Sequence, residues 1–80
     1  MKLPRNLSGE DVVRGLERLG YAVSRRKGSH IRLTTQREGE HHVTIPNHDP
    51  LKVGTLAAVL AAVGQHLGLE REALLDEMFG

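Results

Sequence analysis

The sequence contains no cysteine among its 80 residues. Disulfide bonds, thiolate metal sites and cysteine nucleophiles are therefore excluded. Aromatic side chains are limited to one tyrosine and one phenylalanine, so stacking on nucleic-acid bases can contribute little. The longest apolar stretch, VGTLAAVLAAVG, is much shorter than the roughly 20 residues of a membrane span. The first ten residues lack the apolar run of a signal peptide, and we expect one small cytoplasmic domain over residues 1–80.

Positive charge is concentrated in one part of the chain. Residues 1–54 carry ten Lys and Arg against six Asp and Glu, whereas residues 55–80 carry one Arg against four acidic residues. Between Tyr21 and Arg37 there are five cations and no acid. Such a local excess suits a polyanion such as nucleic acid, although a solvated basic turn has the same composition.

Apolar periodicity predicts helices on both sides of a central β segment. Ser8 followed by Asp11 is typical of a helix N-terminus, and Gly20 is typical of the end of that helix. Within it, Gly15 would permit the close approach of another backbone or of a sheet. A second helix is predicted by one apolar stripe: Leu56, Val59, Leu60, Val63 and Leu67. The stretch LEREALLDEMF predicts a short last helix.

Between these helices the apolar period changes to two, which predicts three short strands in an antiparallel meander. The apolar residues of the second and third strands must face the helices: Ile31, Leu33, Val43 and Ile45. The alternate residues must then face the other way: His30, Arg32, Thr34, His42 and Thr44. If the QREGE loop is symmetric, Thr35 pairs with His41 and His30 with Pro46. The fold class is therefore α+β, in the order α-β-β-β-α, with a three-stranded antiparallel sheet and helices on one face.

The segment RRKGSHIRL at residues 25–33 places four cations around one histidine, with a Gly-Ser pair before it. Two interpretations compete. The histidine acts on an anionic substrate, or the stretch is a solvated, charged turn.

A set of motifs along the chain bears on this choice. LERLGY ends the first helix, KGSH opens the second strand, VTIPNH follows, and GTLAAVL lies on the second helix. Together they resemble the HicA-type messenger-RNA interferase toxins, also called the YcfA-like family, over roughly Ser8 to Leu75. The resemblance implies a fold similar to a double-stranded RNA-binding domain, ribosome-independent RNA cleavage and neutralisation by a HicB-type antitoxin. It matches His30 to the catalytic histidine of the family's glycine-serine-histidine motif. Many members carry an aromatic residue shortly after that histidine, where this chain has Ile31, Arg32 and Leu33.

The chemistry of RNA cleavage can be considered separately from the resemblance. RNA carries its own nucleophile, the 2′-OH, so a ribonuclease needs a base and positive charge near the phosphate. Histidine is suited to acid–base work at neutral pH, and His30 is the candidate catalytic residue. The candidate RNA-binding residues surround it: Arg25, Arg26, Lys27, Gly28, Ser29 and Arg32. No cofactor and no metal are needed in this scheme.

The remaining histidines have other expected roles. His48, in the loop PNHDP, is the candidate second acid or base, because the predicted register brings that loop toward His30. His41 and His42 point to opposite faces of a strand and cannot both bind one metal. A zinc site that also uses His30 and His48 stays an alternative, but no carboxylate or cysteine completes it well. His66, on the alanine-rich helix, is expected to be exposed.

Three function classes remain open from sequence alone. The first is a ribonuclease toxin that acts on mRNA and is silenced by an antitoxin. The second is a non-catalytic RNA-binding module that uses the basic turn and Lys52. The third is a protein-binding module that uses the open sheet face and the acidic C-terminal part.

Overall fold

The first helix, α1 (Gly9–Leu19), begins and ends at the residues that the sequence predicted. In the computed structural model, which describes residues 3–80, the Ser8 hydroxyl accepts a hydrogen bond from the Asp11 amide. The Asp11 carboxylate accepts one from the Ser8 amide in return. Gly20 ends the helix at a φ of 106°, in the left-handed region that favours glycine. The predicted cap and helix end are confirmed.

Three strands follow: β1 (Ala22–Lys27), β2 (His30–Thr35) and β3 (His41–Pro46). They form an antiparallel sheet in the order β1-β2-β3. The pairs between the last two strands are those predicted from a symmetric loop: Thr35–His41, Thr34–His42, Arg32–Thr44 and His30–Pro46.

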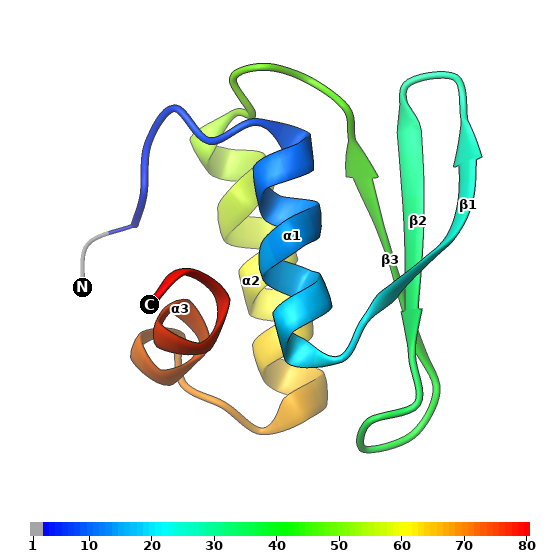
Figure 1. Cartoon of the computed structure of the whole chain (residues 1–80). Coiled ribbons are helices and arrows are strands. Elements are labelled where there is room, and N and C mark those ends of the chain that lie inside the picture. The colour runs from blue at the N-terminus through cyan, green and yellow to red at the C-terminus, as the bar shows by residue number, and fades with distance from the viewer. Residues whose placement is uncertain (1–2) are drawn as a thin grey trace.

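Two further helices, α2 (Val53–Leu67) and α3 (Arg71–Phe79), complete the chain. Figure 1 shows three layers: the sheet, then α1 and α2 against one of its faces, then α3 on the far side of those helices. No element of residues 3–80 covers the other face of the sheet. The predicted α+β class, element order and one-sided helix packing are confirmed.

The core lies between the sheet and the helices. The four strand residues predicted to face inward are each at most 9% exposed: Ile31, Leu33, Val43 and Ile45. Burial of one such side chain stabilises the fold by about 1.5–3 kcal/mol. Their burial fixes which strand residues point to the open face.

Gly15 admits a helix rather than a sheet or a neighbouring backbone. A Cβ at this position would lie 3.0 Å from Cε1 of Phe79 and 3.1 Å from Cβ of Met78. Both residues belong to α3, whose contacts with α1 attach it to the rest of the molecule. The expected close approach is made by α3, through the side chains of Met78 and Phe79, whereas the sheet packs on another side of α1.

His66 is half-buried and bonded, so the expectation that it is simply exposed was wrong. Its Nε2 lies 2.9 Å from the carbonyl oxygen of Arg37 and 3.0 Å from that of Gly39. Carbonyls only accept, so this nitrogen donates its proton to the β2–β3 turn. The His66 ring stacks on His41 with centroids 4.3 Å apart, and Nδ1 of His41 lies 2.8 Å from the Tyr21 hydroxyl. The end of α2 is thereby tied to the hairpin.

Among residues 3–80, no single helix is long and apolar enough to cross a membrane. The helices α2 and α3 pass such a test only as a pair, and they bend by 103° at their junction.

The start of α1 is pressed against the end of β3. The Gly9 amide donates a 2.8 Å hydrogen bond to the carbonyl of His48, and Gly9 is buried. A Cβ at Gly9 would lie only 2.4 Å from the carbonyl oxygen of Pro46. By contrast, a Cβ at Gly54, in the first turn of α2, would meet nothing within 4 Å.

These two glycines give a matched pair of substitutions. We expect Gly9→Ala to lower the free energy of unfolding by about 1–3 kcal/mol, because the backbone of β3 must move. The same change at Gly54 should be neutral or stabilise by up to about 1 kcal/mol through helix propensity. Urea unfolding of both variants measures this, and equal effects at the two positions would contradict the close contact of α1 with β3.

The His41 ring also makes stability depend on pH. Burial is the main cause that lowers the pKa of His41, and the neighbouring His66 and His42 lower it further. The unfolded chain therefore binds a proton at His41 more readily than the folded chain does. Stability from this residue is fully present above the ordinary histidine pKa of about 6.5 and is lost as the pH falls below it.

We accordingly expect the unfolding free energy to decrease between about pH 6.5 and about pH 5. The decrease should be smaller in the His41→Gln variant, measured by urea unfolding across this range. The carboxylates with lowered pKa values titrate below this window: Glu10, Asp11 and Glu40. Identical pH profiles for the two proteins would show that His41 has no such role.

Candidate nucleic-acid interface

A shift of one residue in β1 decides where its cations point. Val23 pairs with Leu33 and Arg25 pairs with Arg32, so Ser24 is an extra residue on β1. This is a β-bulge, which changes the alternation of side chains along a strand. After it, Arg25 and Lys27 stand beside Arg32 and His30, on the face away from the helices.

The same shift sends Arg26 to the helix side of the sheet. Arg26 pairs with the buried Ile31 across the strands, and its guanidinium binds the Glu10 carboxylate of α1 at 2.8 and 3.2 Å. This hydrogen bond is the main cause that lowers the pKa of Glu10. The structure therefore separates Arg26 from the other cations of its segment.

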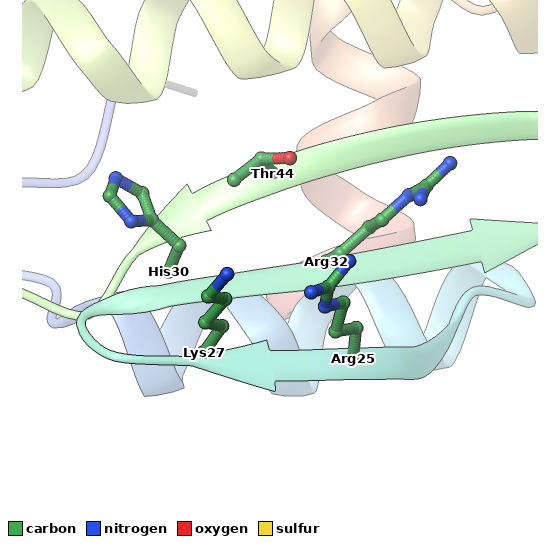
Figure 2. Close-up of a pocket in the computed structure, with 5 residues that line it drawn as sticks. All are labelled: Arg25, Lys27, His30, Arg32 and Thr44. Carbon is green, nitrogen blue, oxygen red and sulfur yellow. The ribbon is translucent and has the colours of Figure 1, made fainter.

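Five side chains line a hollow of about 300 Å³ on the open face of the sheet: Arg25, Lys27, His30, Arg32 and Thr44. They come from all three strands, and Figure 2 shows them on the same side of the sheet, with Thr44 between His30 and Arg32. Three of the five are permanent cations and none is acidic. Guanidinium and ammonium groups bind phosphate oxygens strongly. The hollow thus offers an imidazole and three anion-binding groups at one place.

The Gly28-Ser29 turn holds His30 at the very start of β2. Gly28 has a φ of 58°, which favours glycine, and no atom lies within 4 Å of where its Cβ would be. The Ser29 carbonyl accepts a 2.6 Å hydrogen bond from the amide of Asn47. The turn is therefore fastened to the loop after β3, and His30 has a defined origin at the rim of the sheet.

His48 lies in that loop but does not line the hollow. Its amide donates to the Pro46 carbonyl, and its own carbonyl accepts from Gly9. Its side chain is exposed. Lys52, at the start of α2, is also exposed and outside the hollow.

The other histidines are placed on opposite faces of β3, as predicted. His41 is on the helix side against Tyr21 and His66. His42 is on the open face, where it contacts Thr34 and Glu40. Within residues 3–80, no three His, Asp or Glu side chains gather closely enough to hold a metal ion.

Sequence reasoning missed two residues of this site. Thr44 was predicted on the open face but was not considered part of the site. Its cross-strand pairing with Arg32 was the signal that could have included it. The bulge at Ser24 has no clear signal in the sequence. Without it, simple alternation from Val23 would place Arg26 on the open face and Arg25 and Lys27 on the helix side.

Comparison with known proteins gives one family. Residues 9–65 match the family model described as the HicA toxin of bacterial toxin-antitoxin systems. The matched range includes α1, the whole sheet and most of α2. No curated protein and no solved structure gives a significant match.

The different positions of the cations predict different effects on binding of a polyanion. Arg25→Ala and Lys27→Ala should each weaken binding of a single-stranded RNA and reduce the salt slope by about one. Arg26→Ala removes the same charge from the other side of the sheet and should affect binding less. Fluorescence anisotropy at several salt concentrations measures all three. Equal losses of RNA affinity in Arg25→Ala and Arg26→Ala would show that binding does not depend on which face of the sheet carries the cation.

Proposed function

The chain belongs to the HicA toxin family, and from this premise we propose that it is an endoribonuclease that cleaves mRNA with His30 as its acid–base group. The toxin role and an antitoxin partner follow from the family. The observation that supports the chemistry is the hollow on the open face, where one imidazole lies among three cations without an acidic side chain.

The proposed reaction uses the substrate's own nucleophile. His30 removes the proton of a 2′-OH, and the 2′-oxygen attacks the adjacent phosphorus. The bond from phosphorus to the 5′-oxygen breaks, and that oxygen receives a proton. The products are a 2′,3′-cyclic phosphate and a free 5′-OH.

The surrounding groups act on charge and position. Arg25, Lys27 and Arg32 stabilise the negative charge that grows on the non-bridging oxygens. Gly28 and Ser29 let the backbone of the turn come close to the phosphate. Arg26 contributes to binding only through its charge, since Glu10 holds its guanidinium. His48 is the candidate donor of the proton to the 5′-oxygen.

The proposed partners are mRNA and a HicB-type antitoxin. The hollow is open to solvent and no element of the described chain shields it. An inhibitor that covers the open sheet face would exclude RNA from His30. The proposed location of this reaction is the cytoplasm, where its substrate is found.

The decisive experiment compares RNA cleavage by the wild type, His30→Ala and His48→Ala, with a chelator present throughout. We expect the wild type to cut, and His30→Ala to be slower by about 10²–10⁴-fold, the contribution of general acid–base catalysis. His30→Ala should still bind RNA. A comparable loss in His48→Ala would identify the proton donor.

Analysis of the product ends tests the chemistry itself. Only 3′-OH and 5′-phosphate ends would overturn the proposed use of the 2′-OH. If no variant cuts but all bind RNA, the chain is a non-catalytic RNA-binding module. If none binds RNA and a protein partner associates independently of salt, it is a protein-binding module.

A further inference from the structure

A chain of hydrogen bonds crosses all three strands on the open face. The Ser24 hydroxyl donates to the Arg32 carbonyl at 3.2 Å. Thr34 Oγ1 lies 2.9 Å from Ser24 Oγ and 2.7 Å from Nδ1 of His42. Nε2 of His42 lies 2.9 Å from the Glu40 carboxylate. Both ends of the chain, a carbonyl and a carboxylate, can only accept.

The four hydrogen bonds of this network require four protons. The chain contains four hydrogen bonds. Each hydroxyl supplies one proton and a neutral imidazole supplies one, which makes three. The fourth bond exists only when both ring nitrogens of His42 carry protons. A neutral His42 leaves one of the four bonds unmade. When its one proton stays on Nε2 for the Glu40 carboxylate, the bond that is lost lies between Thr34 and His42, between Ser24 and Thr34, or between Ser24 and Arg32.

The hydrogen-bond chain passes through Ser24, the residue that decides the direction of the site's cations. Ser24 is the extra residue of the β1 bulge, and Arg25 and Lys27 face the hollow only because of that bulge. The Ser24 hydroxyl is hydrogen-bonded to Arg32 and Thr34 of β2, the strand that pairs with the bulged strand β1. Protonated His42 thus supports the bulge from the opposite edge of the sheet.

We propose that Ser24, Thr34 and His42 are positioning residues that aim Arg25 and Lys27 at the phosphate, so that RNA is bound more tightly when His42 is protonated. The proposal rests on the proposed function, because the ligand it positions these cations for is RNA. His42 itself does not contact the substrate, since both of its nitrogens are occupied.

The charged and titratable groups that face His42 come from the sheet and from its β2–β3 turn. Glu40 faces it from the β2–β3 turn, and the hydrogen bond with His42 is the main cause that lowers the pKa of this carboxyl. Arg32 on β2 and His41 on β3 are the cationic and titratable neighbours. From α2, the residues that share a groove with His42 are not titratable: Thr55, Ala58, Val59 and Ala62.

The test measures binding of a single-stranded RNA oligonucleotide in a His30→Ala background, which removes cleavage and the imidazole of the hollow. Anisotropy is recorded at constant ionic strength at about pH 5.5 and about pH 8, on both sides of histidine titration. Ser24→Ala, Thr34→Val and His42→Gln are added singly to this parent. Gln65→Ala, at an exposed position on α2, is the control. Circular dichroism melts at both pH values confirm that each variant is folded.

We expect the parent to lose affinity by about 3- to 10-fold from the lower to the higher pH, the effect of one hydrogen bond. The other histidines remain in every variant and add the same pH effect to each. Relative to the parent, Ser24→Ala, Thr34→Val and His42→Gln should each lose about 3- to 10-fold in affinity at low pH and little at high pH, whereas Gln65→Ala should behave like the parent at both.

Three results would overturn the proposal. One is equal affinity of the parent at both pH values. Another is an unchanged pH effect in all three network variants. The last is a pH effect that disappears in His42→Gln but persists in Ser24→Ala and Thr34→Val, which would mean that His42 contacts RNA directly.

The outcomes of this binding test can be distinguished from those of the cleavage experiment. A pH effect in binding without cleavage by the wild type would leave the network standing and refute the nuclease. Cleavage without the pH effect would refute the network alone, and absence of any RNA binding would refute both.

Discussion

The burial of Ile31 and Leu33 against the helices is the constraint on which the rest of the structure depends. Both side chains are at most 1% exposed, and they occupy alternate positions of the central strand. Because side chains alternate across a strand, their burial forces His30 and Arg32 to the open face. A slip of one residue would bury a charged guanidinium and expose the core, so the register of β2 is strongly specified.

The side-chain directions of the edge strand β1 are set in a different way. Only Val23 of this strand is partly buried, so hydrophobic burial specifies the register of β1 weakly. The bulge at Ser24 divides the cations of this strand between two tasks. Arg26 joins β1 to α1 through Glu10, whereas Arg25 and Lys27 are left for the hollow. An exposed ion pair of this kind contributes little stability, and its main consequence is the direction of these side chains.

Helix packing explains why a chain this small can leave one sheet face uncovered. The apolar sides of α1 and α2 cover the inner face, and α3 covers the outer side of those helices. Apart from Tyr21, the buried hydrophobic residues come from five elements and a loop: α1, β2, β3, α2, α3 and the loop with Leu51. The open face need not contribute to the core, and its residues are free to serve a ligand.

The sequence by itself determined the element order, the cap of α1 and the pairing of β2 with β3, because each depends on local signals. Ser8, Asp11 and Gly20 act within one helix, and the alternation of His30 to Thr35 acts within one strand. Tertiary structure alone decided three features: the bulge at Ser24, the packing of Met78 and Phe79 against Gly15, and the stacking of His41 on His66. The last two join segments distant in sequence, so their geometry depends on how whole elements pack, and the bulge depends on how the weakly buried β1 pairs with β2. For the same reason the sequence grouped four cations around His30, and only the folded chain could separate Arg26 from the other three.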